Sequence, residues 1–169
     1  GPWRHWDIHA NGIRFHVVEA IPADLPGADA SPTARPLVIL LHGFGSFWWT
    51  WRHQLRGLTG FRVVAVDLRG YGGSSGPPTR PDHEPYSKRA MARDVVALMR
   101  ILGFARFDMI GHDRGGRTAY RLALDTPQAV GKLSILDIIP TADVWRLADR
   151  RFALGYWHWS FLAQAHPFP

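Results

Sequence analysis

The spacing of apolar residues changes repeatedly along the chain between the period of a strand and that of a helix. Apolar and polar positions alternate through 6–9 and 13–19, on either side of Asn11-Gly12, and this predicts a β-hairpin with a two-residue turn. Continuous apolar runs at 37–41 and 61–66 predict strands that are covered on both faces. The chain therefore begins with an antiparallel pair and continues into a buried sheet.

Helical spacing follows these runs. We predict helices over 47–58, 87–102 and 114–126, and helical, aromatic segments from Thr141 onward. The clearest helix is 87–102, because Ser87 can cap its first turn and its apolar side chains share one face. The residues on that face are Met91, Val95, Leu98 and Met99.

Two further apolar stretches, 107–110 and 132–137, predict strands between these helices. Segments 21–36 and 77–85 are rich in proline and in small or polar residues, and they predict loops. Strands that alternate with helices form parallel sheets covered on both sides. The predicted fold class is therefore α/β, with a mostly parallel sheet flanked by helices and preceded by an antiparallel hairpin.

Length, composition and charge narrow the class of protein. A chain of 169 residues with 46% hydrophobic residues can form one domain with its own core. The absence of cysteine excludes disulfides and thiolate metal sites. The net charge of +6 comes mostly from arginines spread along the chain, which favours small anions over nucleic acid as partners. No apolar run has the length of a membrane span, so we expect a cytoplasmic protein that binds no membrane.

Polar residues follow four of the predicted strands. They are His42 to Phe44, Asp67, Asp113 and Asp137. In parallel sheets the ligand site lies beyond the carboxyl ends of the strands. Four segments that are far apart in the sequence are therefore expected to converge on one rim.

Asp113 occupies the centre of the most informative of these segments. Gly111-x-Asp113-x-Gly115 stands between a predicted strand and a predicted helix, as in the nucleophile elbow of hydrolases, with aspartate where esterases have serine. A carboxylate is already ionised at neutral pH, since its ordinary pKa is about 3.9. It can displace a leaving group from saturated carbon and form an ester, which water must then cleave with the help of a base. The alternative is that Asp113 only caps the helix.

Arg114 and Arg117 lie three residues apart at the start of the same helix and share a face beside Asp113. Cations at a helix N-terminus oppose the macrodipole, at a cost of about 0.3–1 kcal/mol each. An anionic substrate would account for both, because guanidinium binds carboxylate with two hydrogen bonds. Arg117 could instead pair with a structural acid.

Three motifs together resemble the α/β-hydrolase superfamily. They are His42-Gly43-Phe44, Asp67-x-Arg69-Gly70-x-Gly72-x-Ser74 and Gly111-His112-Asp113-Arg114-Gly115-Gly116-Arg117. The second half of the chain resembles one family within it, the haloacetate (fluoroacetate) dehalogenases. The motifs of this closer resemblance are Asp113-Arg114-Gly115-Gly116-Arg117, Leu136-Asp137-Ile138-Ile139-Pro140-Thr141 and Tyr156-Trp157-His158-Trp159. The resemblance implies a hydrolase core over 1–138 and the beginning of a helical cap over 139–169.

The resemblance also implies an activity, the hydrolysis of a haloacetate to glycolate and halide without a cofactor or a metal. Asp113 would be the nucleophile, and Asp137 would be the acid that orients a catalytic histidine. The backbone N–H groups of Phe44 and Arg114 would form the oxyanion hole. Asp137 could instead cap the turn that follows it, and His42 is expected to be structural.

The substrate would be held by the side chains at the helix start and in the cap. In this resemblance Arg114 and Arg117 bind the substrate carboxylate, while His158 and Trp159 bind the departing halide. The alternative for 156–161 is a cap helix that packs on the core.

The chain departs from the family pattern at Gly45, where proline is usual. The base histidine of the family and a cap tyrosine that donates to the halide would both lie past Pro169. We therefore expect the 169 residues to be the N-terminal part of a longer enzyme, for which a homodimer is left open. The segment 132–138 would then be an apolar edge, so we expect this piece to be poorly soluble or oligomeric and incapable of turnover.

Two other functions are compatible with the sequence. An epoxide hydrolase of the same superfamily would use the same nucleophile and base, but it would want tyrosine donors from the cap and would not need Arg114 and Arg117. A non-catalytic, truncated α/β-hydrolase would keep only the scaffold.

Overall fold

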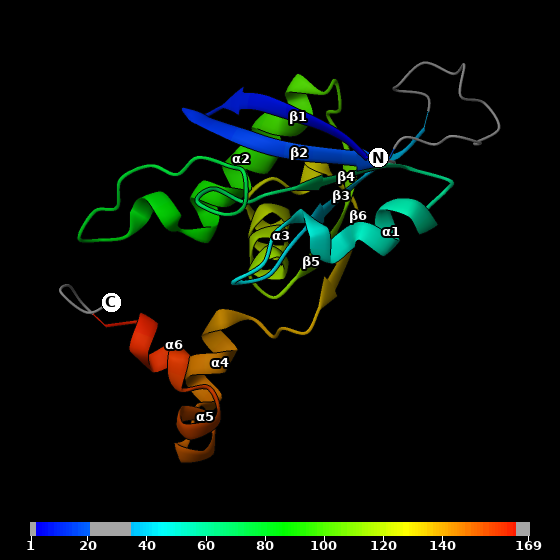
Figure 1. Cartoon of the computed structure of the whole chain (residues 1–169). Coiled ribbons are helices and arrows are strands. Elements are labelled where there is room, and N and C mark those ends of the chain that lie inside the picture. Colours follow the sequence, from blue (N-terminus) through cyan, green and yellow to red (C-terminus); the bar gives the residue numbers. More distant parts are fainter. Residues whose placement is uncertain (1–2, 21–34, 165–169) are drawn as a thin grey trace.

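The computed structural model describes residues 3–20 and 35–164 and contains one mixed sheet (Figure 1). The six strands have the order β1-β2-β4-β3-β5-β6. Their bounds are β1 (Trp3–Ala10), β2 (Ile13–Ala20), β3 (Leu37–Leu41), β4 (Arg62–Val66), β5 (Phe107–His112) and β6 (Val130–Leu136). The first three in the sheet order pair antiparallel, and β4, β3, β5 and β6 pair parallel. The predicted fold class is confirmed, while most of the predicted loop 21–36 lies outside the described residues.

Helices connect the parallel strands and cover both faces of the sheet. Their bounds are η1 (Trp48–Trp51), α1 (Arg52–Gly57), η2 (Glu84–Tyr86), α2 (Lys88–Ile101), α3 (Arg114–Asp125) and η3 (Pro127–Ala129), where η denotes a 3-10 helix. Three short helices follow β6 and extend away from the sheet (Figure 1). They are α4 (Thr141–Leu147), α5 (Arg150–Gly155) and α6 (Trp157–Leu162). None of the described helices is both long and apolar enough to span a membrane.

The hairpin and the second long helix form as their sequences predict. Asn11 and Gly12 both have positive φ, 49° and 74°, which is the turn that matches the twist of a two-residue hairpin. The hydroxyl of Ser87 accepts a hydrogen bond from the Ala90 N–H at the start of α2. The four apolar residues predicted for the inner face of α2 are all buried. Local chemistry therefore determines both elements.

The core lies on the two faces of the sheet. One cluster of buried side chains joins the sheet to α2 and α3, and a second joins it to η1 and α1. All five residues of β3 are buried because this strand is central and covered on both sides. The elements on both faces thus hold the carboxyl ends of the strands in place.

The predicted helix over 47–58 is wrong in detail, because it divides into η1 and α1. In a 3-10 helix residues i and i+3 lie on the same side. Trp48 and Trp51 are therefore both buried, at 9% and 4% exposure, while Trp49 is 45% exposed. The burial of both indole rings therefore favours a 3-10 helix at the start of this segment over one continuous α-helix.

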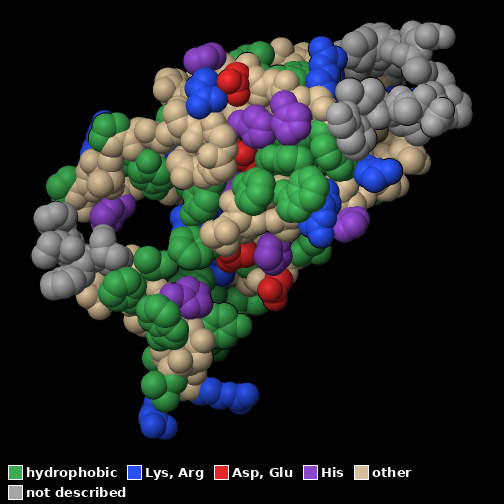
Figure 2. All heavy atoms as spheres, in the orientation of Figure 1, with side chains coloured by type: hydrophobic (Ala, Val, Ile, Leu, Met, Phe, Trp, Pro, Cys, Tyr) green, Lys and Arg blue, Asp and Glu red, His purple; other side chains and the backbone are tan. Residues whose placement is uncertain are grey.

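Apolar side chains are exposed at β6 and on the helices after it. In the described sheet β6 is an edge strand, where Ile135 and Leu136 are 37% and 44% exposed. Hydrophobic side chains also gather on the surface over α4–α6 (Figure 2). Leu154 and Trp157 are 64% and 63% exposed there. An unpaired apolar edge and large apolar patches favour association.

We expect the 169-residue chain to self-associate at micromolar concentrations, and light scattering over a dilution series will measure this. Ile135→Lys should reduce the association, because a lysine on an edge strand disfavours pairing with another strand. Ile101→Lys is a matched control on α2, at a residue that is 56% exposed and lies away from that edge. A monodisperse monomer at all concentrations would contradict the expectation.

Candidate active site

Asp113 occupies a sharp turn between β5 and α3. It has φ 45° and ψ −111°, an unusual conformation for a residue with a side chain, and its N–H donates to the Leu136 carbonyl at 3.2 Å. A Cβ on Gly111 would come within 2.5 Å of the Gly115 carbonyl oxygen, and one on Gly115 would overlap the Leu41 carbonyl. Only glycine therefore permits the close approach that this turn needs.

The Asp113 side chain does not cap α3, so the alternative of a helix cap is wrong. Its Oδ2 atom instead accepts a hydrogen bond of 2.8 Å from the Phe44 N–H. Its Oδ1 atom lies 4.0 Å from Nε of Arg117. One carboxylate oxygen is thus held by a backbone donor, and the other faces a guanidinium.

The turn after β3, where the oxyanion hole is predicted, adopts a conformation that proline could not. Gly45 has φ 65°, whereas proline fixes φ at about −65°. Of the two predicted backbone donors, the Phe44 N–H contacts the carboxylate. The hydrogen bonds of the described residues include none from the Arg114 N–H to Asp113.

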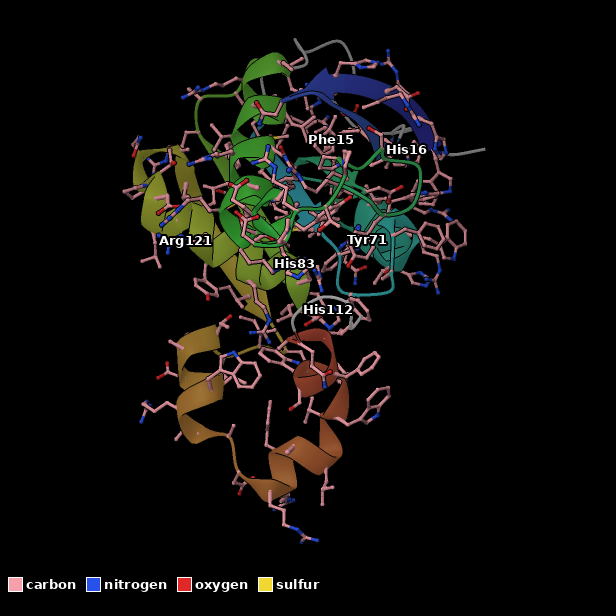
Figure 3. All side chains as sticks on the ribbon, turned by 90° about the vertical axis from the view of Figure 1, so that its left-hand side faces the viewer. Phe15, His16, Tyr71, His83, His112 and Arg121 are labelled. Carbon is pink, nitrogen blue, oxygen red and sulfur yellow. The ribbon has the colours of Figure 1, made fainter. Side chains whose placement is uncertain are left out.

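The Arg114 guanidinium lies between two aromatic rings. Its Cζ atom is 5.1 Å from the centre of the Phe44 ring and 5.8 Å from that of Tyr71. Figure 3 shows Tyr71 on the side of the core that faces α4–α6. Within the described part of the chain Arg114 has no carboxylate partner. Cation–π contacts hold the side chain while its N–H groups stay available to an anion.

Arg117 is buried, at 9% exposure, and it joins the helix start to the segment after β6. Its Nη1 donates to the Ile139 carbonyl at 3.3 Å and to the Thr141 hydroxyl at 3.2 Å. Its Cζ atom lies 4.3 Å from the centre of the Trp159 ring. Burial lowers the pKa of Arg117, and the nearby Asp113 opposes that shift. Asp113 is the acid it meets in the described structure, not a remote structural acid.

Asp137 follows β6 on the same rim, in a left-handed conformation with φ 55°. Its side chain is 89% exposed, and Oδ2 lies 3.8 Å from Nε2 of His112. No hydrogen bond of the described residues ends on this carboxylate, so it does not cap the turn. The carboxylate is therefore open to an imidazole partner on the side of the core that faces α4–α6, where Figure 3 places His112.

His158 and Trp159 lie on α6, and both are partly buried. The Trp159 ring packs against Trp145 and Phe152, with centroids 5.5 and 6.0 Å away, as well as against Arg117. The ring centroids of His158 and Tyr156 are 5.9 Å apart. The interpretation of this segment as a packing helix is thus partly right, yet Trp159 also reaches the site through Arg117.

Two polar residues at the strand ends are structural. His42 is fully buried, its Nε2 accepts from the Leu68 N–H at 3.0 Å, and burial lowers the pKa of this imidazole. Asp67 is also fully buried, and its Oδ1 accepts from the Trp48 N–H at 2.6 Å. Both side chains tie the loops of the rim together, and neither reaches Asp113.

Sequence reasoning missed two residues close to this site, Lys88 and Tyr71. The charges of Arg114 and Asp113 act on the pKa values of both groups. Burial raises the pKa of Tyr71, which therefore stays neutral. Tyr71 follows a glycine of a recognised motif, but Lys88 carries no local signal, because only the packing of α2 on α3 brings it here.

A hollow of about 860 Å³ lies elsewhere, along the outer face of α2. Asn11, Arg93 and Asp125 are among its lining residues, and none of the predicted site residues is. The described residues contain no group of three or more histidine, cysteine or acidic side chains that could hold a metal. The rim around Asp113 is therefore the place where the predicted chemistry converges.

The mixed sheet and the sharp turn between β5 and α3 together indicate the class of the protein. The sequence profile described as the alpha/beta hydrolase fold matches residues 36–164. The chain belongs to the α/β-hydrolase family.

Within that family the chain is similar to a dehalogenase and to epoxide hydrolases. The fluoroacetate dehalogenase of a Burkholderia species is 53% identical over 135 residues, which cover 79% of this chain and 44% of that protein. Epoxide hydrolase 4 of Mus musculus is 38% identical over 131 residues, which cover 77% of this chain and 33% of that protein.

This chain is also similar to a solved structure. The crystal structure of a Nostoc protein assigned to the α/β-hydrolases superposes with a TM-score of 0.85 at 41% identity, covering 99% of this chain and 54% of that one. The chain thus spans about half, or less, of the length of these proteins.

Proposed function

We propose that this protein hydrolyses the carbon–halogen bond of haloacetate-like acids through an ester on Asp113. The observation that carries the proposal is the carboxylate of Asp113, presented at a strained turn. Its Oδ2 accepts a hydrogen bond from the Phe44 N–H, and its Oδ1 faces Arg117 at 4.0 Å with no hydrogen bond among the described residues. Arg114 beside it has no carboxylate partner among the described residues. The similarity to a fluoroacetate dehalogenase supports the same substrate class.

In the first step Oδ1 of Asp113 attacks the saturated carbon that carries the halogen. The carbon–oxygen bond forms as the carbon–halogen bond breaks, and the halide leaves with the electron pair. The Arg114 guanidinium would bind the substrate carboxylate, with Arg117 as a second cation. The indole N–H of Trp159 and an N–H of His158 would donate to the departing halide.

In the second step water adds to the carboxyl carbon of the ester. The negative charge then develops on Oδ2, to which the Phe44 N–H already donates at 2.8 Å. A histidine oriented by Asp137 would take the proton from that water. The bond between Cγ and Oδ1 of Asp113 then breaks, and the histidine would return the proton to the departing Oδ1. Glycolate leaves with Oδ1 as its hydroxyl oxygen, and the oxygen of the water completes the regenerated Asp113 carboxylate.

The first step can be tested alone because it needs no base. We expect incubation with bromoacetate, an acid quench and peptide mass mapping to find a carboxymethyl group on Asp113. Asp143, on α4, is 43% exposed at its side chain and serves as an internal reference for unselective labelling. Labelling of Asp113 no faster than Asp143 would contradict the proposal.

A parallel incubation with styrene oxide distinguishes the related activity. The similarity to epoxide hydrolase 4 makes epoxide opening the second candidate. Faster labelling of Asp113 by the epoxide than by bromoacetate would favour it, since a neutral epoxide has no use for the two arginines. Absence of both labels would favour a non-catalytic protein.

A further inference from the structure

Lys88 stands at the first turn of α2, directly after its cap Ser87. One turn further along α2, the Sδ atom of Met91 accepts a hydrogen bond of 3.6 Å from the Thr118 hydroxyl of α3. The same hydroxyl lies 3.0 Å from the Arg114 carbonyl, one turn back on α3, so its single proton is shared between the two acceptors. In the chain α2 leads from β4 into β5, and α3 leads from β5 to β6, where these strands are parallel. Helices that connect parallel strands return in the opposite direction, so α2 and α3 are parallel to each other. Lys88 is therefore level with the first turn of α3, where Arg114 lies.

The surroundings of Lys88 are crowded with positive charge. Burial, together with the nearby charges of Arg114 and Arg117, lowers the pKa of the Lys88 ammonium to about 8, and the charge of Asp113 opposes this shift. Within the described part of the chain Lys88 has neither an ion pair nor a side-chain hydrogen bond. Lys88, Arg114 and Arg117 thus share the carboxylate of Asp113, and even with Asp137 on the same rim the positive charges exceed the negative ones by one.

Helix dipoles make this arrangement more costly. Neither α2 nor α3 has an acidic residue in its first turn, and both begin with basic ones. A cation at a helix N-terminus is unfavourable by about 0.3–1 kcal/mol, and burial adds to this cost. An anion bound at the rim would reduce the repulsion among the three side chains.

We propose that Lys88 is a specificity-determining residue of this site, a third cation that makes it select anionic over neutral substrates. The inference rests on the proposed function and adds to it a residue that no motif contains. The planar guanidinium of Arg114 supplies two parallel N–H donors for the substrate carboxylate. Lys88 supplies a compact charge from a second helix, and the bound carboxylate is its counter-ion.

The test compares two reagents with the same leaving group, bromoacetate and the neutral bromoacetamide. The rate of Asp113 labelling by each is measured, and their ratio reports the preference for an anion. Lys88→Gln should lower this ratio about tenfold, as expected for the loss of one partly buried charge near the substrate. Lys88→Arg should restore most of it, because the charge is kept.

Lys132 gives a matched control, since it is the other lysine of the chain and lies exposed on β6. Lys132→Gln removes the same charge from the molecule and should leave the ratio within about twofold of wild type, because exposed charges are screened over a Debye length of about 10 Å. An equal fall in both glutamine variants would contradict a local role for Lys88.

The pH dependence separates the role of Lys88 from a structural one. The wild-type ratio should fall as the pH rises through about 8, because the ammonium loses its charge there. In Lys88→Arg the ratio should stay level through the same range. The other titratable groups at the rim are Tyr71, His112, Asp137 and His158, which all variants share.

The two proposals fail separately. If wild type is not labelled at Asp113 by either reagent, the proposed function is wrong. If Asp113 is labelled but the ratio is the same in wild type and Lys88→Gln, or is independent of pH, Lys88 does not select the anion. Circular dichroism of each variant shows whether α2 is intact.

Discussion

Asp113→Asn should abolish the labelling of residue 113 by bromoacetate, to below roughly a thousandth of the wild-type rate. The amide has the shape of the carboxylate, and its oxygen can still accept the hydrogen bond from the Phe44 N–H. It lacks the negative charge and the lone-pair reactivity that displacement at saturated carbon needs. Mass mapping of the peptide that contains 113 measures the loss directly.

Asp143→Asn is the matched control for this variant. It makes the same change on α4, where Asp143 pairs with Arg146 at 2.9 Å on the surface. Labelling of Asp113 should proceed normally in it. If the Asp113→Asn chain still acquired a carboxymethyl group at a comparable rate on a neighbouring side chain of the rim, the nucleophile would have been assigned wrongly.

Arg69→Met should destabilise the fold by about 3–5 kcal/mol, because it leaves a buried carboxylate without its cation. Arg69 and Asp94 are 7% and 3% exposed, and two hydrogen bonds of 2.6 Å join them. The guanidinium also donates to the Pro85 carbonyl at 2.5 Å. This pair connects the loop after β4 to α2, the helix that carries Lys88. Urea unfolding at low protein concentration, followed by tryptophan fluorescence, measures the change.

Arg89→Met serves as the matched control, since Arg89 pairs with Asp125 on the surface. An exposed pair contributes little, so the urea midpoint should hardly change. The double variant Arg69→Met with Asp94→Leu should recover much of the lost stability, because it removes the unpaired charge. Equal urea midpoints for Arg69→Met and Arg89→Met would show that the buried pair stabilises the fold no more than the surface pair does.

The helices, strands and turns of the fold were largely predictable where residues that are close together in the sequence determine the local structure. Asn11-Gly12 specifies its turn, and Ser87 with the apolar face of 87–102 specifies a helix. The same holds for Gly111 to Gly115, whose glycines allow the turn that exposes Asp113. In each case the interactions that decide the structure lie within a few residues of one another.

Prediction was less successful where distant packing decides. The division of 47–58 into two helices follows from the burial of Trp48 and Trp51 against the sheet. The position of Arg117 depends on Ile139 and Thr141, more than twenty residues away. Such contacts have no pattern in the local sequence, so spacing alone could not supply them.

The sequence by itself determined the α/β class, the carboxylate at the elbow and the rim on which the polar segments converge. These features depend on hydrophobic period, on glycine at a tight turn and on the direction of parallel strands. Only the tertiary structure decided which oxygen of Asp113 the Phe44 N–H holds, and that Arg114 is left without an acid in the described chain. It also decided that Lys88 lies near the site. The ammonium comes from a second helix, and its interaction with the charges of α3 depends on the packing of α2 against α3.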